Sequence, residues 1–120
     1  YFELALKSDL KNFGEDHPNV ASRWNNLGAA WKSFGDNSKA IEYIELALKS
    51  DLKNLGKDHP NVARDWSTLG KTWKGIGDYP KAIKYLELAM AAYTKAFGIE
   101  HHLTKKTISN LEIVRKLLEN

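Results

Sequence analysis

Apolar residues recur at steps of three and four along most of this chain, which is the spacing of one face of an α-helix. Trp24, Leu27 and Trp31 follow this spacing in one segment, and Ala40 and Ile44 begin a second run after a short polar break. The breaks contain the Gly, Asp and Pro residues that typically end one helix and begin the next. The pattern predicts six helices, at residues 1–13, 18–34, 37–55, 60–76, 79–97 and 103–119.

The pattern of residues also repeats with a period of 42. Residues 1–42 and 43–84 are identical at 28 aligned positions. A period of this size indicates stacked helix pairs rather than one globular core. Short connections make consecutive helices antiparallel neighbours. We therefore predict an all-α fold, an α-α superhelix of antiparallel helix pairs with about six helices.

The phase of the repeat predicts how this single array is divided. In each unit the first helix is called helix A and the second helix B. Residue 1 aligns with a position inside helix B of the next copy, so we expect it to be a cut end of a longer array. Near the other end Glu112 and Arg115 replace two packing residues, and terminal repeats need a polar outer face. The predicted units are helix B of a truncated repeat, two full repeats and a C-terminal capping helix, at residues 1–14, 15–56, 57–98 and 99–120.

Small and aromatic residues mark the expected helix contacts. Gly28 and Gly70 lie in mid-helix, where glycine costs about 1 kcal/mol relative to alanine, and this cost usually accompanies close approach of a second helix. Ala40 and Ala82 are the expected small residues on the facing helices. The four tryptophans share their helical stripes with leucines, which favours the core over a ligand-stacking surface. They are Trp24, Trp31, Trp66 and Trp73.

The order of packing residues in each unit resembles the tetratricopeptide repeat. The residues that carry this resemblance are Trp24, Leu27, Gly28, Trp31, Gly35, Ala40, Ile44 and Ala47. The turn between units resembles the 42-residue subclass found in kinesin light chain, through Gly14, Asp16, His17, Pro18, Val20, Ala21, Asn25, Asn26 and Leu27. The resemblance implies a superhelix whose concave face is lined by helix A residues and binds other proteins.

Composition and spacing exclude several other functions. The chain has no cysteine, which excludes disulfides and thiolate metal sites. It has no apolar run long enough to cross a membrane and no signal peptide pattern, so we expect a cytoplasmic protein. His17, His59 and His101 recur on equivalent turns, too far apart for one zinc ion, and are interpreted as turn or capping residues. No phosphate loop, nucleophile elbow or nucleophile with its base occurs, so we expect no enzymatic activity, cofactor or metal site.

Helix A positions outside the packing framework form the predicted groove. Five of the six such positions differ between the two copies, although most of the repeat is identical. These positions carry six Lys or Arg residues in the three A helices and no acid, so the modest net charge of +3 is concentrated on one face. The residues predicted to bind a peptide are Asn25, Asn26, Lys32, Arg64, Thr68, Lys71, Lys74, Lys106 and Asn110.

A basic and variable groove predicts a non-enzymatic protein-interaction scaffold that binds acidic or extended peptide segments. Two alternatives stay open: the near-identical units stack end to end into longer assemblies, or the helical repeats bind RNA. No groove residue is aromatic, so bases have no stacking platform, which argues against nucleic acid. The lysines are equally consistent with a solvated helix face. Only Lys106 fits the carboxylate clamp of family members that bind chaperone tails, so that activity is not implied.

Overall fold

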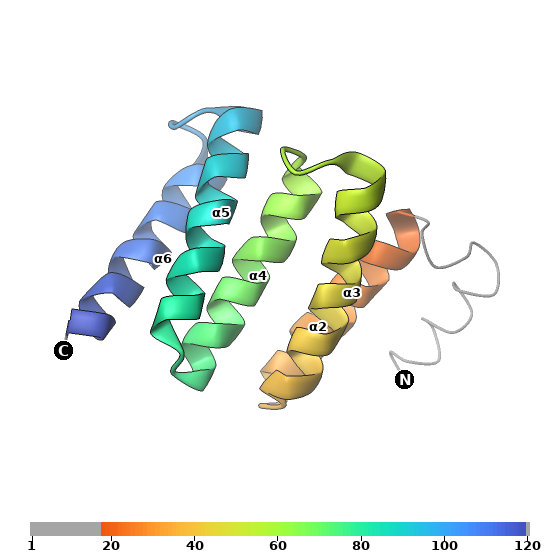
Figure 1. The fold of residues 1–120 in the computed structure, drawn as a ribbon, viewed down its shortest axis with the longest axis horizontal. Coiled ribbons are helices and arrows are strands. Elements are labelled where there is room, and N and C mark those ends of the chain that lie inside the picture. Colours follow the sequence, from red (N-terminus) through yellow and green to blue (C-terminus); the bar gives the residue numbers. More distant parts are fainter. Residues whose placement is uncertain (1–17, 120) are drawn as a thin grey trace.

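A computed structural model describes residues 18–119 of the chain, which form five helices and no strand (Figure 1). The helices are α2 (Pro18–Ser33), α3 (Asn37–Leu55), α4 (Pro60–Ile76), α5 (Tyr79–Phe97) and α6 (His102–Glu119). The all-α prediction is confirmed, and the predicted bounds of α3, α4 and α5 agree with the structure. The helix predicted at residues 1–13 lies outside the described residues.

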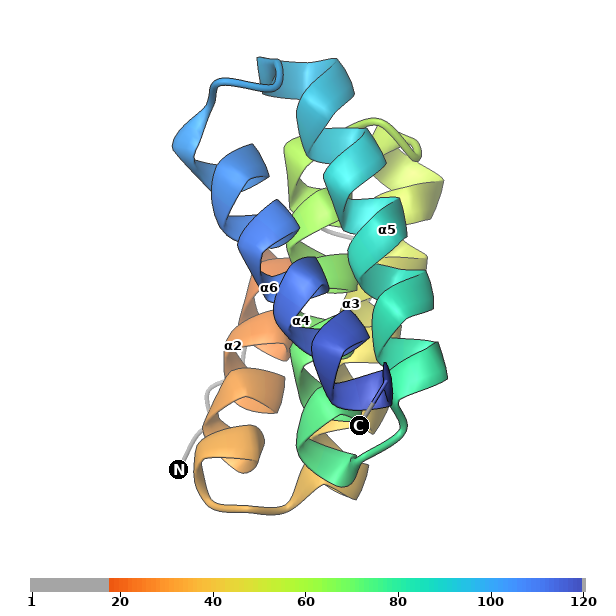
Figure 2. The ribbon, with the colours of Figure 1, turned by 90° about the vertical axis from the view of Figure 1, so that its left-hand side faces the viewer.

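The helices form an array of two layers. Each helix packs mainly against its neighbours in sequence, in an antiparallel zigzag (Figure 1). Viewed from the end that carries α6, helices α2, α4 and α6 lie toward one side, and α3 and α5 lie toward the other (Figure 2). We call these the helix A layer and the helix B layer. The predicted helical solenoid is therefore the architecture of the part that the structure describes.

Equivalent side chains begin the helices of each repeat. The carboxylates of Asp36 and Asp78 accept from the backbone N–H groups at the starts of α3 and α5. His59 Nδ1 accepts from the Asn61 N–H at 3.1 Å, and His101 Nδ1 accepts from the N–H two residues onward at 3.2 Å. The capping interpretation of these two histidines is confirmed, and His17 lies outside the described residues. Each cap satisfies a backbone donor that the first turn of a helix leaves unpaired.

Replacing Asp78 by alanine should lower the free energy of unfolding by about 1 kcal/mol, because the Lys81 N–H loses the carboxylate oxygen 3.2 Å away. Urea denaturation of the two proteins measures this difference. Asp78→Asn is the control, since its amide oxygen can accept the same hydrogen bond and should keep most of the stability. An unchanged denaturation midpoint for Asp78→Ala would show that the cap contributes nothing.

Mid-helix glycines allow the layers to approach closely. A Cβ atom on Gly70 would stand 2.6 Å from Leu86 Cγ and 3.2 Å from the Ala82 carbonyl oxygen. A Cβ atom on Gly28 would stand 2.5 Å from Ile44 Cγ1 and 3.0 Å from the equivalent alanine carbonyl oxygen. The packed side chains would have to move to admit either atom. The predicted close approach at both glycines, with alanine on the facing helix, is confirmed.

Aliphatic residues fill the space between the layers, and the tryptophans pack around them. Trp24 is buried, whereas the other three tryptophans are half-buried and pack against buried residues. The ammonium groups of Lys39 and Lys81 lie 4.2 and 4.3 Å from the ring centroids of Trp31 and Trp73, which are equivalent pairs in the two repeats. These rings therefore serve packing, as predicted, and one face of two of them is covered by a lysine.

Candidate functional site

A cluster of buried polar side chains lies where α3 meets α4. The Asn25 amide of α2 is 5% exposed and donates from Nδ2 to Asp65 Oδ1 at 2.6 Å. Asp51 of α3 and Asp65 of α4 are both fully enclosed. Arg64 Nη2 lies 3.7 Å from Asp51 Oδ2 and 3.6 Å from Asp65 Oδ1. Three helices thus contribute to one interior group of two carboxyls, one guanidinium and one amide.

One carboxyl of this cluster, that of Asp65, is held in its protonated form. Burial raises the pKa of Asp65 to about 9, and the hydrogen bond to Asp51 and its charge act in the same direction. The Arg64 charge and the Asn25 hydrogen bond oppose this rise without cancelling it. At neutral pH Asp65 therefore keeps its proton, because two adjacent buried carboxylates cannot both ionise cheaply. The guanidinium of Arg64 therefore lies beside a neutral Asp65 carboxyl.

A cavity of about 160 Å³ opens beside this cluster, between α4 and α6. We call it the cation cavity, after Arg64, Lys71 and Lys106 in its lining. Thr68 and Asn110 also line it, so five of the predicted groove residues surround one space. Ser67, another of the predicted helix A groove positions, lines it as well, whereas Tyr93, Leu103 and Thr107 were not predicted.

The lysines around the cation cavity repel one another. Burial lowers the pKa of Lys71, and the nearby charges of Lys106 and Lys32 lower it further. These three residues come from α4, α6 and α2, so the charges converge from all three helices of the helix A layer. Within residues 18–119 none of the three forms an ion pair with a carboxylate. An anion placed between them would relieve a repulsion that the protein itself leaves uncompensated.

The other predicted groove residues lie elsewhere. Asn25 belongs to the interior, where its amide already binds Asp65, and is therefore not presented to a ligand. Asn26 is exposed on α2, and Lys74 is half-buried near the end of α4, outside the lining of the cation cavity. The Thr68 hydroxyl donates to the Arg64 carbonyl oxygen within α4, so it is left to act as an acceptor.

The buried acids beneath this basic face were not predicted from the sequence. Asp65 replaces the Arg23 of the preceding copy, and this reversal of charge at an equivalent position was the available signal. Tyr93 was missed as well, although it stands where Asp51 stands one repeat earlier. Burial raises the pKa of the Tyr93 phenol, with Arg64 opposing and Asp65 adding to the rise. The phenol therefore stays protonated at the wall of the cavity.

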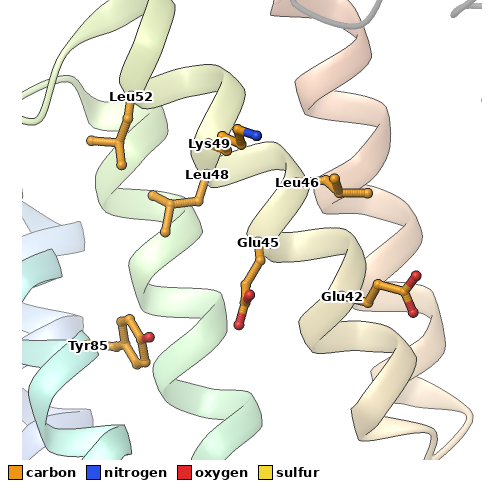
Figure 3. Close-up of a pocket in the computed structure, with 7 residues that line it drawn as sticks. All are labelled: Glu42, Glu45, Leu46, Leu48, Lys49, Leu52 and Tyr85. Atoms are coloured by element: carbon orange, nitrogen blue, oxygen red, sulfur yellow. The ribbon is translucent and has the colours of Figure 1, made fainter.

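A larger and mainly apolar hollow lies on the helix B layer. It has a volume of about 600 Å³ and lies between α3 and α5. Leu48 and Leu52 extend toward the side on which Tyr85 lies (Figure 3). Glu42, Glu45 and Lys49 contribute its charges, and these have mixed sign. Because no group of polar side chains of one kind converges there, the smaller cation cavity offers the more specific chemistry.

Comparison with known proteins places this arrangement in a family. The family model described as tetratricopeptide repeat matches residues 33–95. Among solved structures, a putative kinesin light chain from Podosopora anserina with nearly identical TPR-like repeats is 21% identical, with a TM-score of 0.86 over 94% of this chain. BtubC (BKLC) from P. vanneervenii is also 21% identical, with a TM-score of 0.71 over 99% of this chain.

These solved structures share the fold and are longer than the chain. The chain spans 54% of the first and 56% of the second, so it corresponds to about half of each. No curated protein sequence matches the chain. Within residues 18–119, no helix combines the length and the apolar character needed to cross a membrane.

Proposed function

Because the chain belongs to the tetratricopeptide repeat family, we propose that it is a protein-interaction scaffold whose helix A layer binds acidic peptide segments. The family supports a scaffold for protein partners. The acidic character of the ligand is our inference from the cation cavity. It rests on one observation above all: Lys71 and Lys106 meet at one cavity without a carboxylate to pair with among the described residues.

Charge and size together favour a peptide with an acidic side chain. The cation cavity, at about 160 Å³, is smaller than the roughly 300–1,000 Å³ of sites that hold a complete small molecule. It suits one anionic group rather than a whole ligand. A peptide would place that group in the cavity and extend across the helix A layer, where Lys32 and Asn26 of α2 are available to it. The lysines would speed association as well as strengthen binding.

Reversing two charges at the cavity tests this proposal. A labelled peptide of alternating glutamate and glycine should bind the wild-type protein in fluorescence anisotropy, and Lys71→Glu with Lys106→Glu should weaken binding by about 100-fold. The peptide with glutamine in place of glutamate should bind neither protein. The expected loss follows because the double variant replaces two attractive charges by two repulsive ones.

The matched control moves the same charge change away from the cavity. Lys57→Glu with Lys84→Glu alters the net charge equally at exposed positions outside the cavity lining. This variant should retain most of the affinity, because exposed distant charges are screened by salt. Equal weakening in both double variants would mean that only the net charge attracts the peptide, and the proposed site would be wrong.

A further inference from the structure

We infer that the cation cavity is a pocket for a phosphomonoester, so that the peptide segment carries a phosphorylated serine or threonine at this point. The inference rests on the proposed function and narrows its ligand. It concerns only the group that enters the cavity between α4 and α6, not the residues that flank it along the helix A layer.

The number of positive charges exceeds what one carboxylate would balance. Arg64, Lys71 and Lys106 line the cavity, and Lys32 is near enough to act on Lys71. Among the described residues, the carboxyls of Asp51 and Asp65 beneath the cavity pair with Arg64 and not with the lysines. The lysines therefore remain uncompensated. A phosphomonoester carries a charge of about −1.5 to −2 at neutral pH, whereas a glutamate side chain carries one.

The donors at the cavity also match a phosphate better than a carboxylate. Arg64 Nε and Nη2 are enclosed, with Nη2 3.6 and 3.7 Å from the two Asp oxygens, so Arg64 contributes its positive charge rather than these two donors. Lys71 and Lys106 each bring up to three N–H donors, and the Asn110 amide brings two more. Three terminal phosphate oxygens can accept from several of these groups at once, whereas a carboxylate offers two oxygens.

The cavity has the walls that a phosphorylated side chain requires. Leu103 and the Tyr93 ring line it beside the cations, which gives the short aliphatic stem of a phosphoserine or phosphothreonine an apolar surface. Free inorganic phosphate gains nothing from these walls or from Lys32 farther along the helix A layer. A phosphopeptide uses both, so the structure favours it over the free ion.

Three labelled peptides with the same flanking residues and different centres test the inference. The flanking residues alternate aspartate and glycine, and the centre is phosphoserine, a pair of adjacent glutamates, or serine. Near physiological salt and neutral pH, the phosphoserine peptide should bind about tenfold more tightly than the glutamate-pair peptide of similar charge. The serine peptide should bind most weakly. Inorganic phosphate should displace the phosphoserine peptide only at concentrations far above that peptide's dissociation constant.

Two single substitutions test whether the preference for phosphoserine arises in the cavity. Lys106→Met, which keeps most of the length of the side chain and removes its charge, should remove the preference for phosphoserine over the glutamate pair. Lys74→Met removes a cation of the same helix layer outside the cavity lining, and should weaken both peptides by similar small factors. Circular dichroism and denaturation midpoints of both variants would show that each remains folded. Loss of the preference in Lys74→Met but not in Lys106→Met would overturn the assignment to this cavity.

Failure of this inference can be told apart from failure of the proposed function. Equal affinity for the phosphoserine and glutamate-pair peptides overturns the phosphate pocket and leaves the acidic-peptide scaffold standing. Absence of binding by every acidic peptide overturns both. Displacement by inorganic phosphate at the dissociation constant of the phosphopeptide would show a site for the free ion, which also overturns the inference.

Discussion

Replacing Leu86 by alanine is expected to lower the free energy of unfolding by about 2–5 kcal/mol. Leu86 is 0% exposed and packs with buried residues of α5 and α6, while its Cγ occupies the position opposite Gly70 of α4. Three helices therefore border the space that the substitution would empty, and none of them can move in without losing its other contacts. Urea denaturation followed by circular dichroism measures the loss.

Leu88→Ala provides the matched control for this prediction. It makes the same chemical change on the same helix, but Leu88 is 36% exposed. This substitution should lower the free energy of unfolding by no more than about 1 kcal/mol, because less apolar surface returns to water and no enclosed cavity forms. Similar losses in the two variants would mean that the contact between α4, α5 and α6 is not the packed core of this repeat.

The second large effect concerns Asp65 and pH. Its folded-state pKa of about 9 lies above the ordinary value of 3.8, so from about pH 4 to about pH 9 the unfolded chain has released a proton that the folded protein retains. Stability must then fall as the pH rises through this range, by up to about 1.4 kcal/mol for each pH unit. Asp65→Asn carries no titrating group there. The free energy of unfolding of Asp65→Asn minus that of the wild type should therefore increase by about 3 kcal/mol between pH 5 and pH 7.

The difference between the two proteins is the quantity to measure, because other groups titrate equally in both. The amide oxygen that Asp65→Asn introduces can still accept from Asn25 Nδ2, so this interior hydrogen bond is kept. Asp58→Asn is the control, since Asp58 is an exposed acid paired with Lys95. The free energy of unfolding of this variant should change with pH in the same way as that of the wild type. If the Asp65→Asn curve also ran parallel from pH 5 to pH 8, Asp65 would be ionised in the folded protein and its raised pKa would be wrong.

The helices were predictable from sequence because their ends are marked locally. Glycines at residues 35, 56, 77 and 98 adopt positive φ, the conformation in which glycine is favoured, and caps such as Asp36 and Asp78 follow two of them directly. The six-helix count remains a prediction for residues 1–17. The cations of the candidate site were predictable for a different reason: they differ between copies whose packing residues do not.

The interior of the site was not predictable in the same way. The helical period assigns Asn25 to the same stripe as other surface positions, and only the packing of α2 against α4 shows that its amide is enclosed. Asp51 is likewise indistinguishable in sequence from the exposed acids of helix B. Its burial depends on Arg64 and Asp65 of another helix, and such partners are fixed by tertiary contacts rather than by any local pattern.

The burial of Asp51 and Asp65 also bears on how near-identical units keep their order. Where α3 meets α4 the equivalent positions hold two acids, and where α5 meets α6 they hold Tyr93 and Thr107. If α3 docked on α6 during folding, Asp51 would be separated from Arg64 of α4, and a buried polar group without its partner is costly. The aliphatic contacts alone barely distinguish one repeat from the next. The two acidic side chains thus make docking of α3 on α4 more favourable than docking of α3 on α6.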